Sequence, residues 1–228
     1  MNNASIRWRA EEWQGASFFD LDHTLLRGNS SYHFGAYLFK HGQISLRLLG
    51  QLLLFYGLYQ LSLLSVVQMQ QLIFRSLFKG KSALAMRAWA QAFVAGRIKE
   101  LLCPFTLSRL MQAQKEGQFT AILSSSPDFL VEVIAHHLRV TAWEATRYHV
   151  DHLQQFDQIS HFFLGKEKAE WVVVCSQTLD FDKEQLCAYS DSIQDLPFLE
   201  SVGMAVGVNP DRMLRKICKS RQWLILEE

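Results

Sequence analysis

Residues Phe18–Leu26 read FFDLDHTLL, an apolar run that ends in two aspartates two positions apart, Asp20 and Asp22, followed by Thr24. Residues two apart on a strand share a face, so both carboxylates are predicted to enter one cleft at the strand end. Burying like charges beside apolar groups costs free energy unless a cation or hydrogen-bond donors compensate. The pattern favours Mg²⁺-dependent chemistry in which one aspartate attacks and the other moves a proton. The plain alternative is a polar turn in which Asp22 or Thr24 caps the next helix.

The rest of the chain places this stretch at the start of an α/β fold. Strands are predicted at Ala16–Leu21, Phe119–Leu123, Leu186–Ser190, Met204–Val208 and Trp223–Leu226, with short strands across Trp143–Phe163. Helices are predicted at Leu130–Leu138, Glu167–Ser176, Leu196–Ser201 and Asp211–Ser220, with four or five more between Ser30 and Gln114. Pro127 fits a first helical turn with Ser126 as its N-cap. Alternating strands and helices predict a doubly wound, Rossmann-like parallel sheet with helices on both faces.

The long helical stretch predicts an insert within that sheet domain. The core is expected to comprise residues 16–28 and 105–228, and residues 29–104 are expected to form a helical-bundle cap inserted after the first strand. A chain of 228 residues is long enough for one large domain with a smaller insert. The cap is expected to swing on its two short connections, closing over the site during reaction and opening for product release.

Composition excludes some classes of protein. With 23 basic and 22 acidic residues the formal net charge is +1, and no basic stripe indicates a nucleic-acid surface. The four cysteines lack metal-ligand or redox spacing and are predicted to be buried thiols in a reducing compartment. The N-terminal MNNASIRWRAEEW lacks the apolar region of a secretory signal. A cytoplasmic location is the expectation.

One stretch keeps a membrane contact open. Residues Leu48–Phe74 carry no charge, and their length would suffice to span a bilayer. Five glutamines interrupt the stretch, and a spanning segment would divide the catalytic domain between two sides of the membrane. Packed cap helices are therefore favoured, and a hairpin that rests on the inner face of the membrane is the alternative.

Further reactive residues are predicted at the same edge of the sheet, because ligands bind beyond the carboxyl ends of parallel strands. Ser124 follows the second strand, while Asp191 and Asp195 follow the strand Leu186–Ser190. Lys166 and Lys168 start the helix before that strand. Singly, each has a structural explanation: a cap, a solvated lysine, or an acidic residue favoured near a helix N-terminus. Their convergence at one edge favours a reactive site.

The ordered segments resemble the motifs of the haloacid dehalogenase superfamily of phosphohydrolases. DLDHT is similar to its first motif, AILSSS to its second, GKEKA supplies the lysine, and SDSIQD is similar to its acidic fourth motif. The helical insert, LSSSPDFLVEVIAHHL and the C-terminal region resemble the phosphoserine-phosphatase-like branch. The resemblance covers nearly the whole chain after residue 16.

The resemblance implies a role for each matched residue. Asp20 would be the nucleophile that forms an aspartyl-phosphate, and Asp22 would act as general acid and then general base. Ser124 and the backbone N–H of Ser125 would hold phosphate oxygens. Mg²⁺ would bind the Asp20 carboxylate, the backbone carbonyl of Asp22, and Asp191.

The lysine and the supporting groups follow from the same resemblance. A lysine would neutralise the phosphoryl group, and the pattern Gly-x-x-Lys-Ala favours Lys168 over Lys166. Asp195 would orient that lysine or a metal-bound water, and Gln194 would lie near the attacking water.

The substrate is where this chain departs from the branch. Phosphoserine phosphatases carry a glutamate nine residues after the nucleophile, which pairs with the substrate ammonium, and here that position is Asn29. An amide cannot replace that charge, so phosphoserine is disfavoured. The predicted function is Mg²⁺-dependent hydrolysis of a small phosphorylated metabolite through an aspartyl-phosphate. The alternatives are a lipid phosphatase at the membrane surface, such as one acting on phosphatidylglycerophosphate, a phosphotransferase, and, least favoured, a non-catalytic binding protein. The oligomeric state is left undecided.

Overall fold

The computed structural model describes residues 13–227, so most of the N-terminal segment examined for a secretory signal lies outside the described residues. The strands are β1 Ala16–Phe19, β2 Phe119–Pro127, β3 Ala142–Val150, β4 Phe156–His161, β5 Leu186–Ser190, β6 Met204–Val208 and β7 Leu224–Leu226. The helices are α1 Ser30–Lys40, α2 Leu46–Gln60, α3 Val66–Ile73, α4 Ala83–Leu101, α5 Pro104–Lys115, α6 Asp128–Leu138, α7 Gly165–Leu179, α8 Leu196–Glu200 and α9 Arg212–Arg221. Short 3₁₀ and π turns join several of them.

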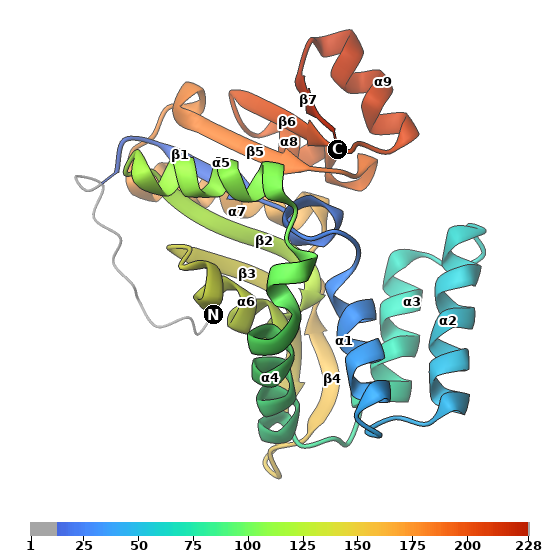
Figure 1. Ribbon diagram of the computed structural model, residues 1–228. Coiled ribbons are helices and arrows are strands. Elements are labelled where there is room, and N and C mark those ends of the chain that lie inside the picture. Colours follow the sequence, from blue (N-terminus) through green and yellow to red (C-terminus); the bar gives the residue numbers. More distant parts are fainter. Residues whose placement is uncertain (1–12, 228) are drawn as a thin grey trace.

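The strands form one sheet in the order β4-β3-β2-β1-β5-β6-β7. All neighbouring pairs are parallel except β3 and β4. Helices cover both faces, as Figure 1 shows, so the predicted α/β, Rossmann-like fold is confirmed. The antiparallel β4 was not predicted, and it follows from the five-residue connection 151–155, which is too short for the crossover that parallel neighbours need.

Alternating residues of β1 divide the core between the two faces of the sheet. Phe18 packs with residues of α7, α8 and α9, including Val172 and Phe198, whereas Phe19 packs with residues of α5 and α6. This is the period-two pattern of a strand that is buried on both sides. Being central, β1 holds its carboxyl end firmly between β2 and β5.

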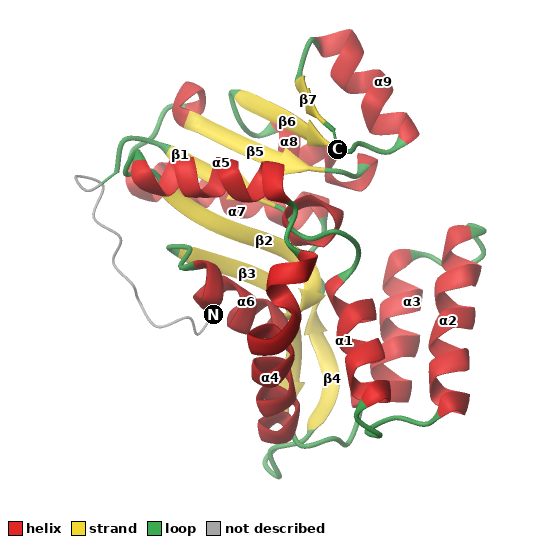
Figure 2. Cartoon of the chain, viewed as in Figure 1, coloured by secondary structure: helices red, strands yellow, loops and turns green. Residues whose placement is uncertain are grey.

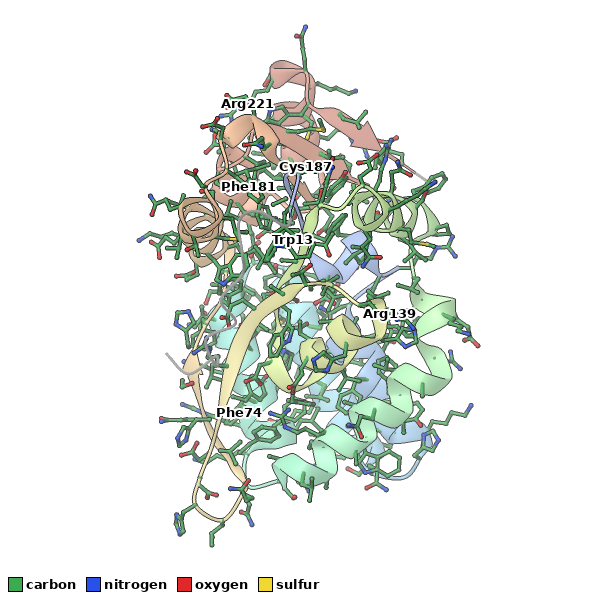
Figure 3. The ribbon with its side chains drawn as sticks, turned by 90° about the vertical axis from the view of Figure 1, so that its left-hand side faces the viewer. Trp13, Phe74, Arg139, Phe181, Cys187 and Arg221 are labelled. Carbon is green, nitrogen blue, oxygen red and sulfur yellow. The ribbon has the colours of Figure 1, made fainter. Side chains whose placement is uncertain are left out.

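The segment between β1 and β2 is helical, as predicted, and it supplies α1 to α5. Figures 1 and 2 show α2 and α3 side by side, beyond α1 and away from the sheet, whereas α4 packs against α6. Figure 3 shows Phe74, directly after α3, beside the strands, and its ring lies 4.8 Å from that of Tyr148 on β3. The insert is thus anchored on the sheet, and its proposed division from the core at residues 29–104 stays a prediction.

The two ends of the insert lie together. The segment after β1 pairs with the end of α4 through an isolated bridge between Leu26 and Leu102. The N–H of Arg27 donates to the carbonyl of Leu101, and the N–H of Cys103 donates to that of Leu25. Both connections therefore leave the sheet at the same point.

Other features of the fold bear on the predictions. No helix within residues 13–227 is long and apolar enough to cross a membrane. All four cysteines are buried, as predicted. The strand predicted to end at Leu123 continues to Pro127, and Pro127 takes the N-cap position of α6, so the prediction of Ser126 as N-cap is wrong.

Candidate active site

The chain leaves β1 at Asp20 and enters one tight turn, Leu21–Leu25. The Asp20 N–H donates to the carbonyl of Tyr189 on β5, which holds the start of the turn against the neighbouring strand. Inside the turn Asp22 is extended and His23 has a φ of 58°. Asp20 and Asp22 line the same cavity, so the expected shared cleft is present. The turn, rather than strand alternation, brings Asp22 there.

Lys168 joins the first and fourth segments of the predicted site. Its Nζ lies 2.6 Å from Asp20 Oδ1 and 2.7 Å from Asp195 Oδ2, and all three side chains are buried. Ser190 at the end of β5 donates a further hydrogen bond to Asp195 Oδ2 at 2.7 Å. Lys166 is exposed and faces Glu170 at 3.6 Å. The structure therefore brings Lys168, and not Lys166, into the cluster.

A glycine allows this approach of α7. A Cβ at Gly165 would lie 2.0 Å from the carbonyl oxygen of Gln194, which is far below any van der Waals contact. Any larger residue would push the N-terminus of α7 away from the loop that carries Asp195. Gly165, three residues before Lys168, thus allows α7 to approach the loop that carries Asp195.

Asp22 is held by the N-terminus of α1. Its carboxylate accepts hydrogen bonds from the Ser30 N–H at 2.6 Å, the Ser126 hydroxyl at 2.6 Å and the Asn29 side-chain amide at 3.1 Å. The positive end of a helix dipole favours an anion at this place. Asn29 is also the N-cap of α1, where its Oδ1 accepts from the Tyr32 N–H. Asn29 lines the cavity, but both ends of its amide already have partners.

The second segment contributes more than the sequence indicated. Ser124 is fully buried, and its hydroxyl accepts a hydrogen bond from the N–H of Ser126 at 3.1 Å. Ser125 and Ser126 line the cavity, whereas Ser124 does not. The bond from Ser126 to Asp22 was not foreseen. The sequence signal for this bond was the run of three serines, because each of their hydroxyl groups can reach a different partner.

The fourth segment closes the cluster. The Thr24 hydroxyl donates to Asp191 at 3.4 Å, and Asp191 lines the cavity. The Gln194 side chain donates to the Tyr59 hydroxyl on α2 at 2.8 Å, so in this arrangement it links the insert to the core. Sequence reasoning missed Asp211, which accepts from the Ile193 N–H and caps α9 while it lines the cavity.

The charges at this edge are unbalanced. Burial raises the pKa of Asp20, with Asp195 and Asp22 adding to the effect and the Lys168 ammonium opposing it. Burial and the charges of Asp20 and Asp195 likewise raise the pKa of Asp191. Burial alone would lower the pKa of Lys168, but the two carboxylates beside it outweigh burial and raise that pKa. The Lys168 ammonium is therefore the counter-ion of several carboxylates, and a further cation would reduce the repulsion among them.

The donor set is compatible with one divalent cation. Within residues 13–227 no three or more His, Cys, Asp or Glu side chains form a group that could hold a metal ion. The predicted set has two carboxylates, Asp20 and Asp191, together with the backbone carbonyl of Asp22. Oxygen ligands supplemented by water and substrate are what Mg²⁺ takes in proteins, and the surplus negative charge fits it.

These residues form one end of a cavity of about 380 Å³. It extends from the carboxylates between the sheet and helices α1 to α3. Figure 1 shows those helices on the side toward which the arrows of β2 and β5 point. A volume within the usual range for small-molecule sites leaves room for much more than a phosphate group.

Comparison with known proteins agrees with this geometry. The family described as haloacid dehalogenase-like hydrolase matches residues 17–200, so the chain belongs to that family. A probable phosphatase of Mycobacterium tuberculosis H37Rv is 30% identical over 215 residues, which cover 92% of this chain and 74% of that protein. The predicted family is therefore confirmed, and the chain is a phosphatase-like hydrolase.

Solved structures share the fold. A protein of unknown function from Bordetella pertussis Tohama I has a TM-score of 0.79 at 23% identity, covering 92% of this chain and 97% of that one. A substrate-bound phosphoserine phosphatase has a TM-score of 0.69 at 14% identity, covering 94% and 93% of the two chains. The architecture is that of the phosphoserine phosphatases, as predicted.

Proposed function

We propose that the protein hydrolyses phosphate monoesters with Mg²⁺ through a covalent phosphoryl group on Asp20. The observation that carries the proposal is the buried contact of Asp20 with Lys168 at the inner end of a cavity. A buried carboxylate beside a fixed ammonium can meet an incoming phosphate without reorganisation of solvent. The names of the relatives support phosphate chemistry, since one is a probable phosphatase.

The proposed reaction has two steps. First, a carboxylate oxygen of Asp20 attacks phosphorus, the ester P–O bond breaks, and the leaving oxygen takes a proton from Asp22. Second, Asp22 takes a proton from water while the water oxygen attacks phosphorus, which releases phosphate and restores the Asp20 carboxylate. The three donors on Asp22 fix its side chain at the wall of the cavity, and this placement supports a part in proton transfer.

The remaining residues would bind charge. The Lys168 ammonium would neutralise phosphoryl oxygens while Asp195 holds it in place. Ser124 and the N–H of Ser125 would bind phosphate oxygens, which requires the Ser124 hydroxyl to turn from its present partner toward the cavity. The Asp20 and Asp191 carboxylates with the Asp22 carbonyl would hold Mg²⁺, which supplies positive charge to a phosphoryl group during transfer.

The test compares two aspartate-to-asparagine variants in the hydrolysis of an aryl phosphate. Asp20→Asn should lower turnover by at least about a thousandfold, because an amide is a poor nucleophile. Asp180→Asn is the matched control, since Asp180 is exposed at a φ of 56°, a conformation that asparagine also adopts. Activity should need Mg²⁺ and disappear with EDTA. An Asp20→Asn enzyme as active as the wild type would refute covalent catalysis at this position.

A further inference from the structure

The cavity has two chemically different halves. Its inner half carries the carboxylates and Lys168, whereas its outer half is lined mainly by apolar and aromatic side chains of the insert and of β3. These are Leu49, Leu52, Leu53, Tyr56, Val66, Met69, Ile73, Leu77, Phe78 and Tyr148. The two halves form one continuous space, so a ligand bound by its phosphate must place its organic part among these residues.

The outer half carries no charge. Of the described residues between 29 and 104 that line the cavity, none has an ionisable carboxylate, ammonium or guanidinium group. Asn29 is neutral and already bonded to Asp22 and Tyr32. A charged group on the organic part of a ligand would therefore lose its water without gaining a counter-ion, at a large cost in free energy.

One polar side chain of the insert has an atom without a partner in the described part of the chain. The Gln70 side chain on α3 lines the cavity, and its Nε2 donates to the Ser125 carbonyl at 3.0 Å. Its Oε1 is buried and has no partner among the described residues. A buried acceptor without a donor costs free energy, and a hydroxyl of a bound ligand would supply that donor. The bond to Ser125 places this acceptor next to the predicted phosphate loop.

The apolar half is also open at its outer end. Leu53 and Tyr56 line the cavity and are nevertheless exposed by 45% and 41%. A chain longer than the cavity can therefore continue past α2 without a clash.

We propose that the substrate is a single-chain amphiphilic phosphomonoester, and this rests on the phosphatase function proposed above. Its phosphate lies at Asp20 and Lys168, an uncharged hydroxyl near the phosphate donates to Gln70 Oε1, and an apolar chain lies between α2, α3 and the sheet. Zwitterionic monoesters such as phosphoserine fit this cavity poorly, because its outer half carries no group of opposite charge to pair with their ammonium and carboxylate.

A series of monoalkyl phosphates from methyl to octyl tests the chain. All are used as monomers in solution, with Mg²⁺, and released phosphate is measured. The kcat/KM should rise by up to about fourfold per methylene until the apolar half is filled. Phosphoserine and an aryl phosphate serve as comparators. A flat series, or phosphoserine as the best substrate, overturns this proposal while the aryl phosphate is still hydrolysed; loss of all these activities overturns the proposed function as well.

Two neighbouring leucines of α2 provide a matched pair of variants. Leu53 lines the cavity and Leu54 does not, although both are substantially exposed. Leu53→Glu should lower the ratio of octyl to methyl phosphate kcat/KM by at least about tenfold, because it puts a charge beside the chain. Leu54→Glu should leave this ratio unchanged. Equal effects of the two substitutions would overturn the placement of the chain.

Gln70 and the source of the chain are tested separately. The wild type should prefer 2-hydroxyoctyl phosphate over octyl phosphate, and Gln70→Met should lose this preference; no preference in the wild type overturns the role of Oε1. A monoacylglycerol phosphate is then supplied either as monomers or in phosphatidylcholine vesicles. If the rate follows the concentration of this phosphate in the vesicle surface, the enzyme takes its substrate from a bilayer. If the rate follows the concentration of free monomers, the enzyme takes it from solution. No hydrolysis of either form overturns the proposed substrate class.

Discussion

Replacement of Lys168 by methionine is the sharpest test of how the site is held together. Lys168 contacts Asp20 at 2.6 Å and Asp195 at 2.7 Å, and the three side chains are exposed by less than a tenth. Methionine keeps the length of the side chain and removes its charge. The variant therefore leaves two carboxylates buried without their counter-ion.

The expected magnitude follows from that burial. Removal of one partner from a buried ion pair typically costs about 3–5 kcal/mol, because the remaining charge stays desolvated. Lys168→Met should lose about this much free energy of unfolding when urea denaturation is measured in the presence of EDTA, so that no cation replaces the ammonium. Activity on an aryl phosphate should fall by about a hundredfold or more.

Two further variants separate this effect from a general one. Lys166→Met removes an exposed lysine that faces Glu170 at 3.6 Å, and it should change the stability by less than about 0.5 kcal/mol. Asp195→Asn in the Lys168→Met background should recover part of the lost stability, because it removes one of the two carboxylates that have no counter-ion. The asparagine side-chain oxygen can still accept the hydrogen bond from the Ser190 hydroxyl. If Lys168→Met unfolds at the wild-type urea concentration, or if Lys166→Met is the variant that loses activity, the electrostatic reasoning is wrong.

Three other predictions concern stability. Burial raises the pKa of Asp128 to about 6, so the folded protein binds a proton at Asp128 more tightly than the unfolded chain does. The stabilisation that comes from this proton is fully present below about pH 4 and is lost as the pH rises through 6. Asp128→Asn should therefore exceed the wild type in stability by about 3 kcal/mol above pH 7, with no difference near pH 3.5, in urea denaturation at both pH values. Gly165→Ala should destabilise by about 1–3 kcal/mol and lower activity, because its Cβ would meet the Gln194 carbonyl, and an unchanged thermal midpoint would contradict this. Asn29→Ala should lower the free energy of unfolding by about 1 kcal/mol, because α1 loses the side chain that accepts from the Tyr32 N–H. Asn29→Ser should retain most of the wild-type stability, as measured by thermal unfolding.

The sequence predicted where the reactive segments meet, because that depends on strand order alone. Asp20, Ser124 and Asp191 each follow a predicted strand, and parallel strands bring their carboxyl ends to one edge. The Gly-x-x-Lys-Ala pattern also favoured Lys168, which is the lysine that lies in the cluster. These predictions needed no knowledge of side-chain contacts.

What the sequence could not predict depends on contacts between distant segments. The hydrogen bond from Ser126 to Asp22 joins residues 104 positions apart, and local rules favoured a helix cap instead. Gln70 reaches Ser125 only because α3 lies over the end of β2, and no local pattern fixes that position. Likewise, the turn after Asp20 bends Asp22 toward α1, although strand alternation had predicted a simple shared face.

The central place of β1 has a consequence for how the protein is made. Its two neighbours, β2 and β5, are both much later in the chain, and the contact of Thr24 with Asp191 spans 167 residues. At about 5–20 residues per second, a ribosome needs roughly 10 to 30 seconds to deliver the second partner strand. For that interval the apolar strand that precedes Asp20 has an open edge. Unpaired apolar strands are prone to aggregate, so chaperone binding to the nascent chain should protect this segment.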